Sequence, residues 1–223
     1  MSSGKPEWLG ILEGQLKEYP QATTYSFATL SPENKPKVRS VIHRAITPSG
    51  LLLTTTDVRM QKPNHLAHDP SVEIAWWILD SAIQLRITGK AYIVSADAAT
   101  TRKAIQAMGV QEGEEGKNEW WQDKREQLWK DLSGHLRGSF GRPTPGTPLD
   151  QVKEKPEDWI QRLDPESDDP KQKKDIEFAK GNFAIIAVQP TGVEVLELKP
   201  QPNRRTQWTK QSDGSWSKVE VSP

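Results

Sequence analysis

The chain has 223 residues, with 30 Lys and Arg against 30 Asp and Glu, and 34% of its residues are hydrophobic. This length suits one domain, or one large domain with insertions, and allows a substantial buried core. The balanced charge produces no global field that would favour nucleic acid or an anionic membrane surface. The absence of cysteine excludes disulfides, thiolate catalysis and thiolate metal sites.

The sequence also lacks the signals of a membrane or exported protein. No apolar run reaches the roughly 18 residues that a membrane span needs, and residues 1–5 lead into a polar, amphipathic stretch without a signal-peptide core. We therefore expect a soluble, cytoplasmic protein. Two of the histidines, His65 and His68, have helical spacing, but only Asp69 lies near them at ligand spacing. We expect no metal site.

The first half of the chain is mostly strand-like. The apolar residues of 6–17 predict a helix, and residues 63–68 predict a short one that ends at Asp69-Pro70. Strand patterns cover residues 24–30, 37–46, 51–56, 72–79 and 83–93. Closely spaced strands with short turns favour an antiparallel barrel or sandwich over a parallel α/β sheet.

The second half is more mixed. Asp97 is placed to cap a helix over 98–108, and residues 118–132 predict another. The Glu/Gly stretch 112–116 is expected to be a loop, 139–148 to be extended, and the charged segment 149–180 to be a surface insertion with one short helix around Trp159. Closing strands are predicted at 183–188, 193–198, 204–210 and 216–221, with a hairpin turn at Asp213-Gly214.

The stretch 51–89 is the candidate functional centre. A buried strand runs out through Arg59 to a helix start at Lys62-Pro63. Positive side chains are disfavoured at a helix N-terminus unless they bind an anion. The free N–H groups at a helix N-terminus also favour a bound anion. A nearby hairpin carries Gln84 and Arg86 on one face, and Arg39 lies in the middle of an earlier strand. These residues indicate a pocket for a phosphate-bearing ligand.

The residues themselves do not define a reaction. There is no Gly-rich phosphate loop, no Ser-His-Asp arrangement and no paired carboxylates, so no catalytic residue is assigned. One geometric tension also arises, because Arg39 and Arg44 would face opposite sides of a regular strand over 37–46. The adjacent Trp76 and Trp77 lie on a strand with two apolar faces, which is typical of an interface.

An ordered set of motifs resembles a known family. The run Arg39-Ser40-Val41-Ile42-His43-Arg44, then Thr55-Thr56 followed by Lys62, then Gln84-Leu85-Arg86-Ile87-Thr88-Gly89 resembles the FMN-binding split barrel of pyridoxamine 5'-phosphate oxidase. A pattern from Trp129 through Ser133 and Arg137 to Gly146 is similar to the oxidase-like branch of fungi and cyanobacteria. The resemblance covers nearly the whole chain except 149–180, and implies a single, mainly β domain over 1–223: an antiparallel six-stranded split barrel with peripheral helices.

The resemblance also implies roles for individual residues. Arg39 and Lys62 would bind the FMN phosphate, with Arg59 compensating for Gln61, which stands where the family usually has a second phosphate-binding arginine. Gln84 would approach the isoalloxazine edge, and Arg205 would touch the cofactor. Further flavin contacts would come from Ser40, Val41, Ile42, Thr55 and Thr56. The substrate phosphate would lie near Arg44, Ser133 and Arg137. Family members are homodimers with FMN at the subunit interface.

The departures from the family pattern concern the substrate. An Arg-x-His-x-Arg run that lies over the substrate in the oxidase is replaced by Gln201-Pro202-Asn203-Arg204-Arg205, and a tryptophan upstream is lost near Val195. Cofactor positions persist while substrate positions do not. We expect an FMN-dependent oxidoreductase with an altered substrate site. The alternatives are a genuine pyridoxamine/pyridoxine phosphate oxidase, a flavin carrier or sensor without turnover, and a different ligand such as heme or another flavin.

Overall fold

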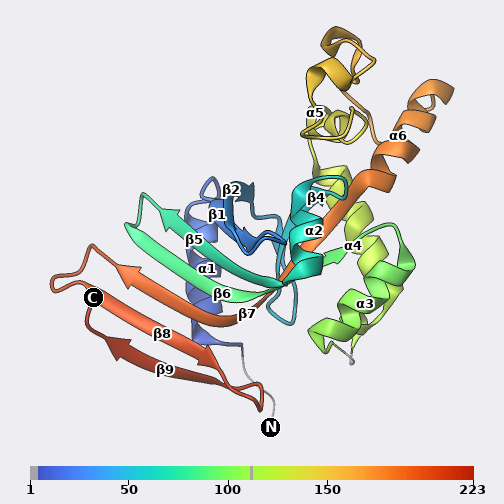
Figure 1. The fold of residues 1–223 in the computed structure, drawn as a ribbon. Coiled ribbons are helices and arrows are strands. Elements are labelled where there is room, and N and C mark those ends of the chain that lie inside the picture. Colours follow the sequence, from blue (N-terminus) through green and yellow to red (C-terminus); the bar gives the residue numbers. More distant parts are fainter. Residues whose placement is uncertain (1–4, 111–112) are drawn as a thin grey trace. The chain divides into compact units, whose positions relative to one another are not determined.

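The computed structural model describes residues 5–110 and 113–223 (Figure 1). The chain divides into two compact units, the first made of residues 1–54, 65–91 and 187–223, and the second of residues 55–64 and 92–186. The expectation of one domain over 1–223 stays a prediction. The expectations for residues 1–4 and for Glu112 lie outside the described residues.

The strands form a nine-stranded sheet in the order β2-β1-β5-β6-β7-β4-β3, with β8 and β9 added beside β7. Its strands are β1 (Thr24–Leu30), β2 (Pro36–Ile42), β3 (Ala45–Ile46), β4 (Leu52–Asp57), β5 (Ser71–Ile78), β6 (Ile83–Val94), β7 (Phe183–Glu197), β8 (Arg204–Lys210) and β9 (Trp216–Val221). The pairs β1–β2, β1–β5, β3–β4, β5–β6, β7–β8 and β8–β9 are antiparallel, as expected. The sheet exceeds six strands because β3 is separate and the β8–β9 hairpin extends it.

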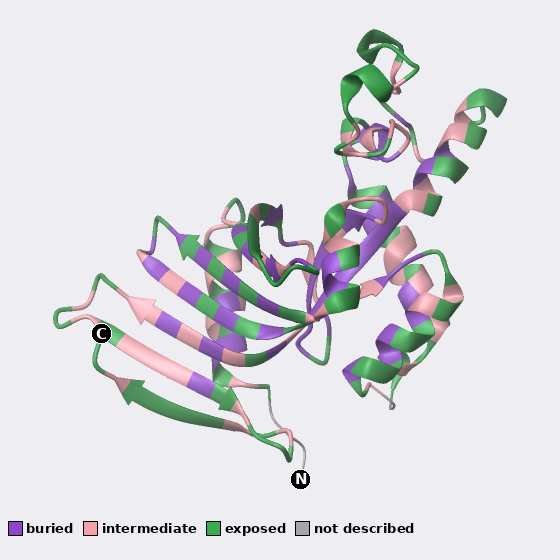
Figure 2. Ribbon diagram, viewed as in Figure 1, coloured by how far each residue is buried: buried purple, intermediate pink, exposed green. Residues whose placement is uncertain are grey.

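The central hairpin of the first unit has the predicted alternation. Along β5 and β6 buried and exposed residues follow one another (Figure 2). Ile74 and Trp76 are paired with Ile87 and Leu85, and all four are buried in the core. On the opposite face, Trp77 is paired with Gln84. One face of this hairpin therefore builds the core, and the other carries the polar candidates.

The predicted strand 37–46 is in fact two strands. β2 pairs with β1 and ends at Ile42, whereas β3 pairs with β4 and begins at Ala45. Between them, the amide of His43 donates to Thr23 O (2.7 Å) and the amide of Arg44 donates to Leu53 O (2.8 Å). The chain changes partner here, so residues 37–46 are not one regular strand, and the expected conflict between Arg39 and Arg44, which assumed such a strand, does not apply as stated.

Strand β7 corrects a second expectation. The predicted strands 183–188 and 193–198 form one continuous strand through Pro190. Gly89 of β6 lies opposite, and a Cβ atom there would come within 2.5 Å of Gln189 O. Only glycine permits this close backbone approach. The close approach of β6 to β7 at this point thus depends on Gly89.

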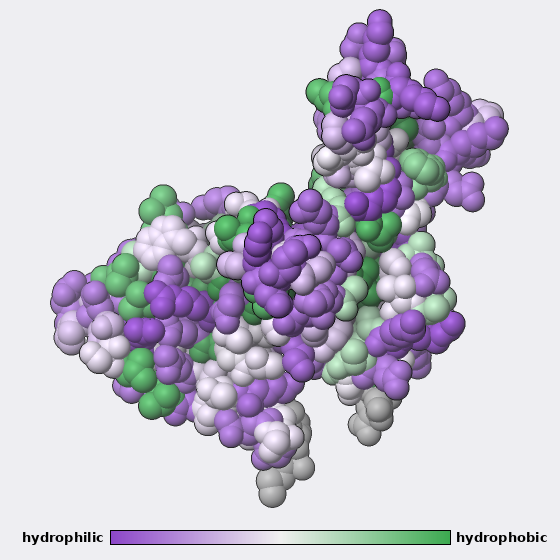
Figure 3. All heavy atoms as spheres, in the orientation of Figure 1, coloured by the Kyte–Doolittle hydropathy of each residue, from purple (hydrophilic) through white to green (hydrophobic). Residues whose placement is uncertain are grey.

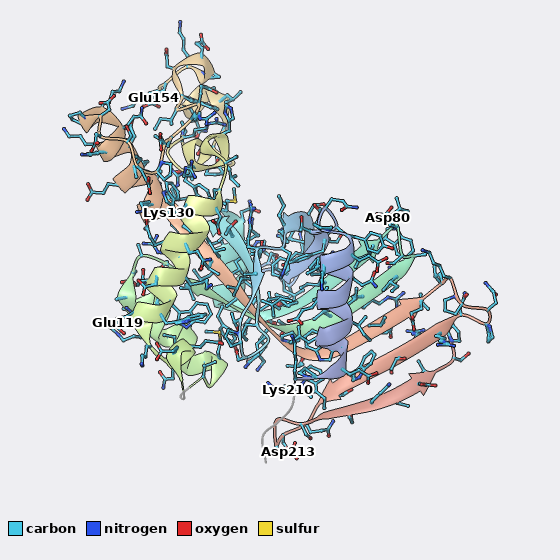
Figure 4. The ribbon with its side chains drawn as sticks, turned by 180° about the vertical axis from the view of Figure 1, so that it is seen from behind. Asp80, Glu119, Lys130, Glu154, Lys210 and Asp213 are labelled. Carbon is cyan, nitrogen blue, oxygen red and sulfur yellow. The ribbon has the colours of Figure 1, made fainter. Side chains whose placement is uncertain are left out.

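Helix α1 (Glu7–Glu18) covers part of the core of the first unit, as Figures 1 and 4 show from opposite sides. Trp8, Leu9 and Leu12 are buried, and the Trp8 ring packs edge-to-face on Trp216 at 5.4 Å. The turn between β8 and β9 contains Asp213, labelled in Figure 4, and Gly214, which has a φ of 86°. The predicted helix over 6–17 and the predicted hairpin turn at Asp213-Gly214 are both confirmed.

In the second unit, α3 (Ala98–Met108) and α4 (Asn118–Asp131) confirm the two predicted helices. The Asp97 side chain accepts from the amides of Ala99 and Thr100, as expected of an N-cap. Glu119 and Lys130 label the two ends of α4 in Figure 4. Part of the expected loop 112–116 is a 3-10 turn, Glu114–Gly116. No helix in the described part of the chain is long and apolar enough to cross a membrane.

Two helices were not expected. Residues 134–139 form α5 (Gly134–Ser139), and the insertion contains α6 (Pro170–Asn182) besides short 3-10 turns at Leu149–Gln151 and Pro156–Asp158. Helix α6 buries only Ile176 and Ala179, so it lacks the apolar stripe by which a helix is recognised. Its start did carry a signal, because Asp169 caps it and Pro170 occupies its first turn.

The insertion is anchored through glycines of α5. A Cβ atom at Gly134 would come within 2.7 Å of the Arg162 side chain, and one at Gly138 within 3.0 Å of Gln161 backbone. Leu163 is 1% exposed, and its amide donates to Gly134 O. Residues 161–163 thus belong to the packed part of the second unit, although most of the insertion surface is hydrophilic (Figure 3).

Candidate functional site

Arg39 is held in the first unit through one of its nitrogens. It is half-buried on β2, and its Nη1 donates to Phe27 O (3.2 Å), Thr29 Oγ1 (2.8 Å) and Lys37 O (3.0 Å). Burial lowers the pKa of its guanidinium. Within the described residues nothing accepts from Nε or Nη2. A guanidinium oriented in this way presents its remaining donors to a ligand, and their geometry suits a phosphate.

The residues after Arg39 alternate between the two faces of β2. Val41 is buried, whereas Ser40 and Ile42 are exposed. The hydroxyl of Thr54 donates to Ile42 O (2.8 Å). Next to them, His43 lies buried against the Trp76 ring, and burial followed by the charge of Arg44 lowers the pKa of His43 to about 4.

A second polar cluster lies on the face of the sheet that carries Gln84. Gln84 Oε1 accepts from Arg86 Nε (2.9 Å), and Arg86 forms an ion pair with Glu194 (3.3 Å). The other carboxylate oxygen of Glu194 accepts from Arg205 Nη2 and Gln207 Nε2, both at 2.8 Å. The structure therefore links Gln84 and Arg205, which were predicted as separate cofactor contacts.

This cluster keeps one donor unsatisfied. Burial raises the pKa of the Glu194 carboxyl, but the hydrogen bonds from Arg205 and Gln207 and the neighbouring charges outweigh it, so the net shift is downward. Arg205 Nε is buried and has no hydrogen-bond partner among the described residues. A buried donor without a partner is costly.

Glu194 and its partners Arg86 and Gln207 were not predicted as a unit. An acidic residue in an alternating strand usually belongs to a solvent-exposed face. The sequence pattern therefore gave no reason to assign Glu194 to a site. Its ladder partner is Gln207, and Arg205 pairs with Leu196 on the same strands. The register of β7 and β8 could not be derived from the sequence.

In the second unit, Arg59 is occupied by the protein. It pairs with the buried Asp57 (2.6 Å), while its Nη1 donates to Arg142 O (2.8 Å) and its Nη2 to Phe140 O (3.0 Å). These contacts satisfy a guanidinium that lies close to the ring of Phe178. A phosphate role for Arg59 stays a prediction, and it would require these bonds to break.

The neighbouring candidates lie at the end of β4 and the start of α2 (Gln61–His68). Thr55 is half-buried, and the buried Thr56 donates to Asp57 O (3.2 Å). Lys62 is the second residue of α2, and its Nζ lies 3.4 Å from Met60 Sδ. The predicted position of Lys62 at a helix start is confirmed. Its contact with a phosphate stays a prediction.

Arg137 has a structural role. It is 7% exposed, and its Nη1 donates to the carbonyls of Trp129 (3.3 Å), Lys130 (3.0 Å) and Leu132, while its Nε donates to Leu163 O (3.0 Å). The last carbonyls of a helix lack intrahelical partners, so Arg137 caps the end of α4. Ser133 is the exposed N-cap of α5. Substrate contacts of Arg44, Ser133 and Arg137 stay predictions.

Comparison with known proteins agrees with this arrangement. Residues 5–95 match the family described as "Pyridoxamine 5'-phosphate oxidase, FMN-binding domain". The pyridoxine/pyridoxamine 5'-phosphate oxidase 2 of Arabidopsis thaliana is 24% identical over 97% of this chain and 96% of its own length. This chain is thus similar to pyridoxine/pyridoxamine 5'-phosphate oxidases over nearly its whole length, and residues 5–95 match the FMN-binding domain of that family. The resemblance stated from the motifs is confirmed.

Solved structures confirm the fold class. An FMN-binding protein of Nostoc punctiforme, related to pyridoxamine 5'-phosphate oxidase, has a TM-score of 0.72 at 23% identity, covering 99% of this chain and 100% of its own. PhzG of Burkholderia lata, solved with tetrahydrophenazine-1-carboxylic acid, has a TM-score of 0.64 at 12% identity, covering 100% and 95%. Both likenesses concern the fold, which is the split barrel with peripheral helices expected for this family.

The contacts of Arg137 lead to a stability prediction. Arg137→Met keeps the apolar stem but leaves the carbonyls at the end of α4 without donors, so we expect the free energy of unfolding to fall by about 2–4 kcal/mol. Arg102→Met, at an exposed position of α3, is the matched control and should change it by less than about 0.5 kcal/mol. Urea denaturation measures both. Equal stability of the two variants would show that Arg137 is not needed for the fold.

Proposed function

We propose that this chain binds FMN and acts as a flavin-dependent oxidoreductase whose substrate site differs from that of pyridoxamine phosphate oxidases. The observation that carries the proposal is Arg39, which is oriented by three protein acceptors and keeps two nitrogens without one. The match of residues 5–95 to a domain described as FMN-binding supports the same ligand.

The residues fit the chemical groups of FMN. Arg39 and Lys62 would hold the dianionic phosphate, since charge-assisted hydrogen bonds are the strong ones. Gln84 and Arg205 would contact the flavin ring system. Side-chain and backbone contacts would come from Ser40, Val41, Ile42, Thr55 and Thr56. FMN, when bound, supplies the capacity to accept a hydride or electrons.

The segment before β8 supports an altered substrate site. Gln201 and Asn203 stand where the oxidase has an arginine and a histidine. The Asn203 amide is directed at its own loop, with its nitrogen 3.2 Å from Leu198 O and 3.0 Å from Pro200 O in the orientation that satisfies both. Neither residue supplies the positive charge that would hold a second phosphate over the flavin.

Two alternatives have some support. The Arabidopsis relative is named as an oxidase of pyridoxine and pyridoxamine phosphates, and Arg204 is exposed next to the altered run, which favours the genuine oxidase. A carrier or sensor without turnover needs only the cofactor contacts. The PhzG structure shows that this fold is compatible with a ligand of different chemistry, since fold alone does not set the substrate.

We further propose that the chain forms a homodimer through the open face of the first unit. Val38, Ile42 and Trp77 expose 71%, 43% and 42% of their surfaces. Between them in the register lie the small residues Ser26, Ala28 and Ala75. A flat sheet face with large apolar side chains around small ones suits close packing against a second copy.

Light scattering tests the dimer. We expect the mass of a dimer at micromolar concentration, and Trp77→Lys, which places a charge in the proposed interface, should shift the distribution towards the monomer. Glu154→Lys, at an exposed position of the insertion (labelled in Figure 4), is the control and should leave the mass unchanged. A monomeric parent protein with FMN bound would contradict the proposal.

FMN binding has a direct mutational test. Arg39→Ala and Lys62→Ala should each weaken FMN affinity about ten- to a hundredfold, because each removes a charge-assisted contact of roughly 1.5–3 kcal/mol. Titration with FMN, followed by quenching of flavin fluorescence, gives the dissociation constants. Circular dichroism checks that both variants remain folded. Parental affinity in both would mean that the phosphate lies elsewhere, and preference for FAD would also count against the proposal.

The altered substrate site is tested with pyridoxamine 5'-phosphate. We expect the FMN-loaded protein to oxidise it very slowly or not at all, since small losses of positioning can remove several kcal/mol of barrier lowering. The assay follows the formation of pyridoxal phosphate and hydrogen peroxide. Restoring the charges with Gln201→Arg and Asn203→His should raise the rate. A parental rate in the range of ordinary flavin oxidases, about 1–10 per second, would support the genuine oxidase.

A further inference from the structure

The side chain that orients Arg39 is itself held by a histidine. Thr29 of β1 is 3% exposed, and its hydroxyl accepts from Arg39 Nη1 at 2.8 Å. On its other side, the same hydroxyl lies 2.9 Å from Nδ1 of His65, which is 4% exposed on α2. Phe27 O and Lys37 O, the other acceptors of Nη1, belong to the backbone. Thr29 is therefore the one side chain among the described residues that accepts from Arg39.

Arginine can only donate, so Thr29 Oγ1 accepts from Arg39. The single hydrogen of the hydroxyl can then be donated to Nδ1 of His65 in the tautomer in which that nitrogen is an acceptor. Nδ1 can accept it only in the neutral imidazole that carries its proton on Nε2. Burial first, then the charges of Arg39 and Lys37, lower the pKa of His65, while Glu33 acts in the opposite direction. Near neutral pH the histidine is thus in the form that the chain of bonds requires.

We propose that Thr29 and His65 are positioning residues that hold Arg39 ready for the phosphate of FMN. This inference rests on the proposed function and extends it to two residues that contact no ligand. The buried hydroxyl fixes Nη1, so Nε and Nη2 keep one direction before the ligand arrives. Such preorganisation avoids the entropy cost of ordering a long side chain during binding.

The arrangement also makes phosphate recognition depend on pH. A proton on Nδ1 would turn the acceptor into a donor, and Thr29 could no longer donate to it. The new charge would also lie beside Arg39 and Lys37, with Glu33 as the nearby carboxylate. Both effects weaken the hold on Arg39, so the phosphate contribution to binding falls as the pH drops through the lowered pKa of His65.

Paired variants at Thr29 test the positioning role. Thr29→Val keeps the shape and removes the hydroxyl, whereas Thr29→Ser keeps the hydroxyl. We expect Thr29→Val to weaken FMN binding about tenfold, the value of one hydrogen bond to a charged group, and Thr29→Ser to stay within about threefold of the parent. Riboflavin, which lacks the phosphate, should bind all three proteins alike. Equal effects of Val and Ser, or an equal loss of riboflavin affinity, would overturn the inference.

Variants at His65 provide an independent readout that does not require Thr29→Val to fold. His65→Gln keeps an acceptor for Thr29 but does not titrate. Measured from pH 5 to pH 8, the ratio of FMN to riboflavin affinity should fall more steeply at low pH in the parent than in His65→Gln. Protonation of the FMN phosphate is common to both proteins and cancels in the comparison. Superimposable pH profiles would show that His65 has no part in phosphate binding.

The same titrations separate failure of this inference from failure of the proposed function. If the parent binds FMN no more tightly than riboflavin, it does not recognise the phosphate, and both proposals are wrong. If the parent prefers FMN and Arg39→Ala removes the preference, while the Thr29 and His65 variants behave like the parent, Arg39 binds the phosphate without their help. Only the positioning role is then overturned.

Discussion

A buried guanidinium must find acceptors for its N–H groups, and this requirement organises both units. In the second unit, four arginines donate to backbone carbonyls of segments distant in sequence: Arg59, Arg125, Arg137 and Arg142. These bonds hold segments that have no regular strand or helix partner, including the end of α4 and the insertion near Leu163. Arg39 in the first unit is the instructive contrast. It is anchored through Nη1, and its Nε and Nη2 have no acceptor among the described residues, which makes it a candidate for the ligand.

The sheet of the first unit separates the core from the polar residues. Alternation along β5 and β6 sends Trp76, Leu85 and Ile87 into the core and leaves Gln84 and Arg86 outside. Strands β7 and β8 then add Glu194 and Arg205 to the same cluster, with Glu194 as the shared acceptor. A carboxylate between two arginines keeps both side chains in place at low conformational cost. The positions of Gln84 and Arg205 thus depend on Glu194, which binds Arg205 directly and Gln84 through Arg86. No ligand contact is proposed for Glu194 itself.

The residues proposed for the cofactor and those that depart from the oxidase pattern lie in different kinds of structure. Arg39 lies on a strand and Lys62 at a helix start. The altered residues Gln201 and Asn203 lie in the short connection between β7 and β8, where substitution disturbs little packing. This placement is compatible with the proposal that the chain binds FMN and has an altered substrate site. Function here follows from the site, since the fold admits several ligands.

The sequence by itself determined the order and type of most elements. The period-2 pattern of 83–93, the Asp97 cap and the Asp213-Gly214 turn are local signals, because each depends on residues within a few positions. It also predicted Arg39 and Lys62 as anion ligands, which stays a prediction, and it suggested the family resemblance. It did not reveal that the strand over 37–46 changes partner at His43, that α6 exists without an apolar stripe, or that Arg59 and Arg137 serve backbone carbonyls. The sequence also did not show that the side chains of Thr29, Arg39 and His65 contact one another. Only the tertiary structure decided these points, because strand register and side-chain partners come from contacts between segments far apart in the chain, and residue spacing carries no information about them.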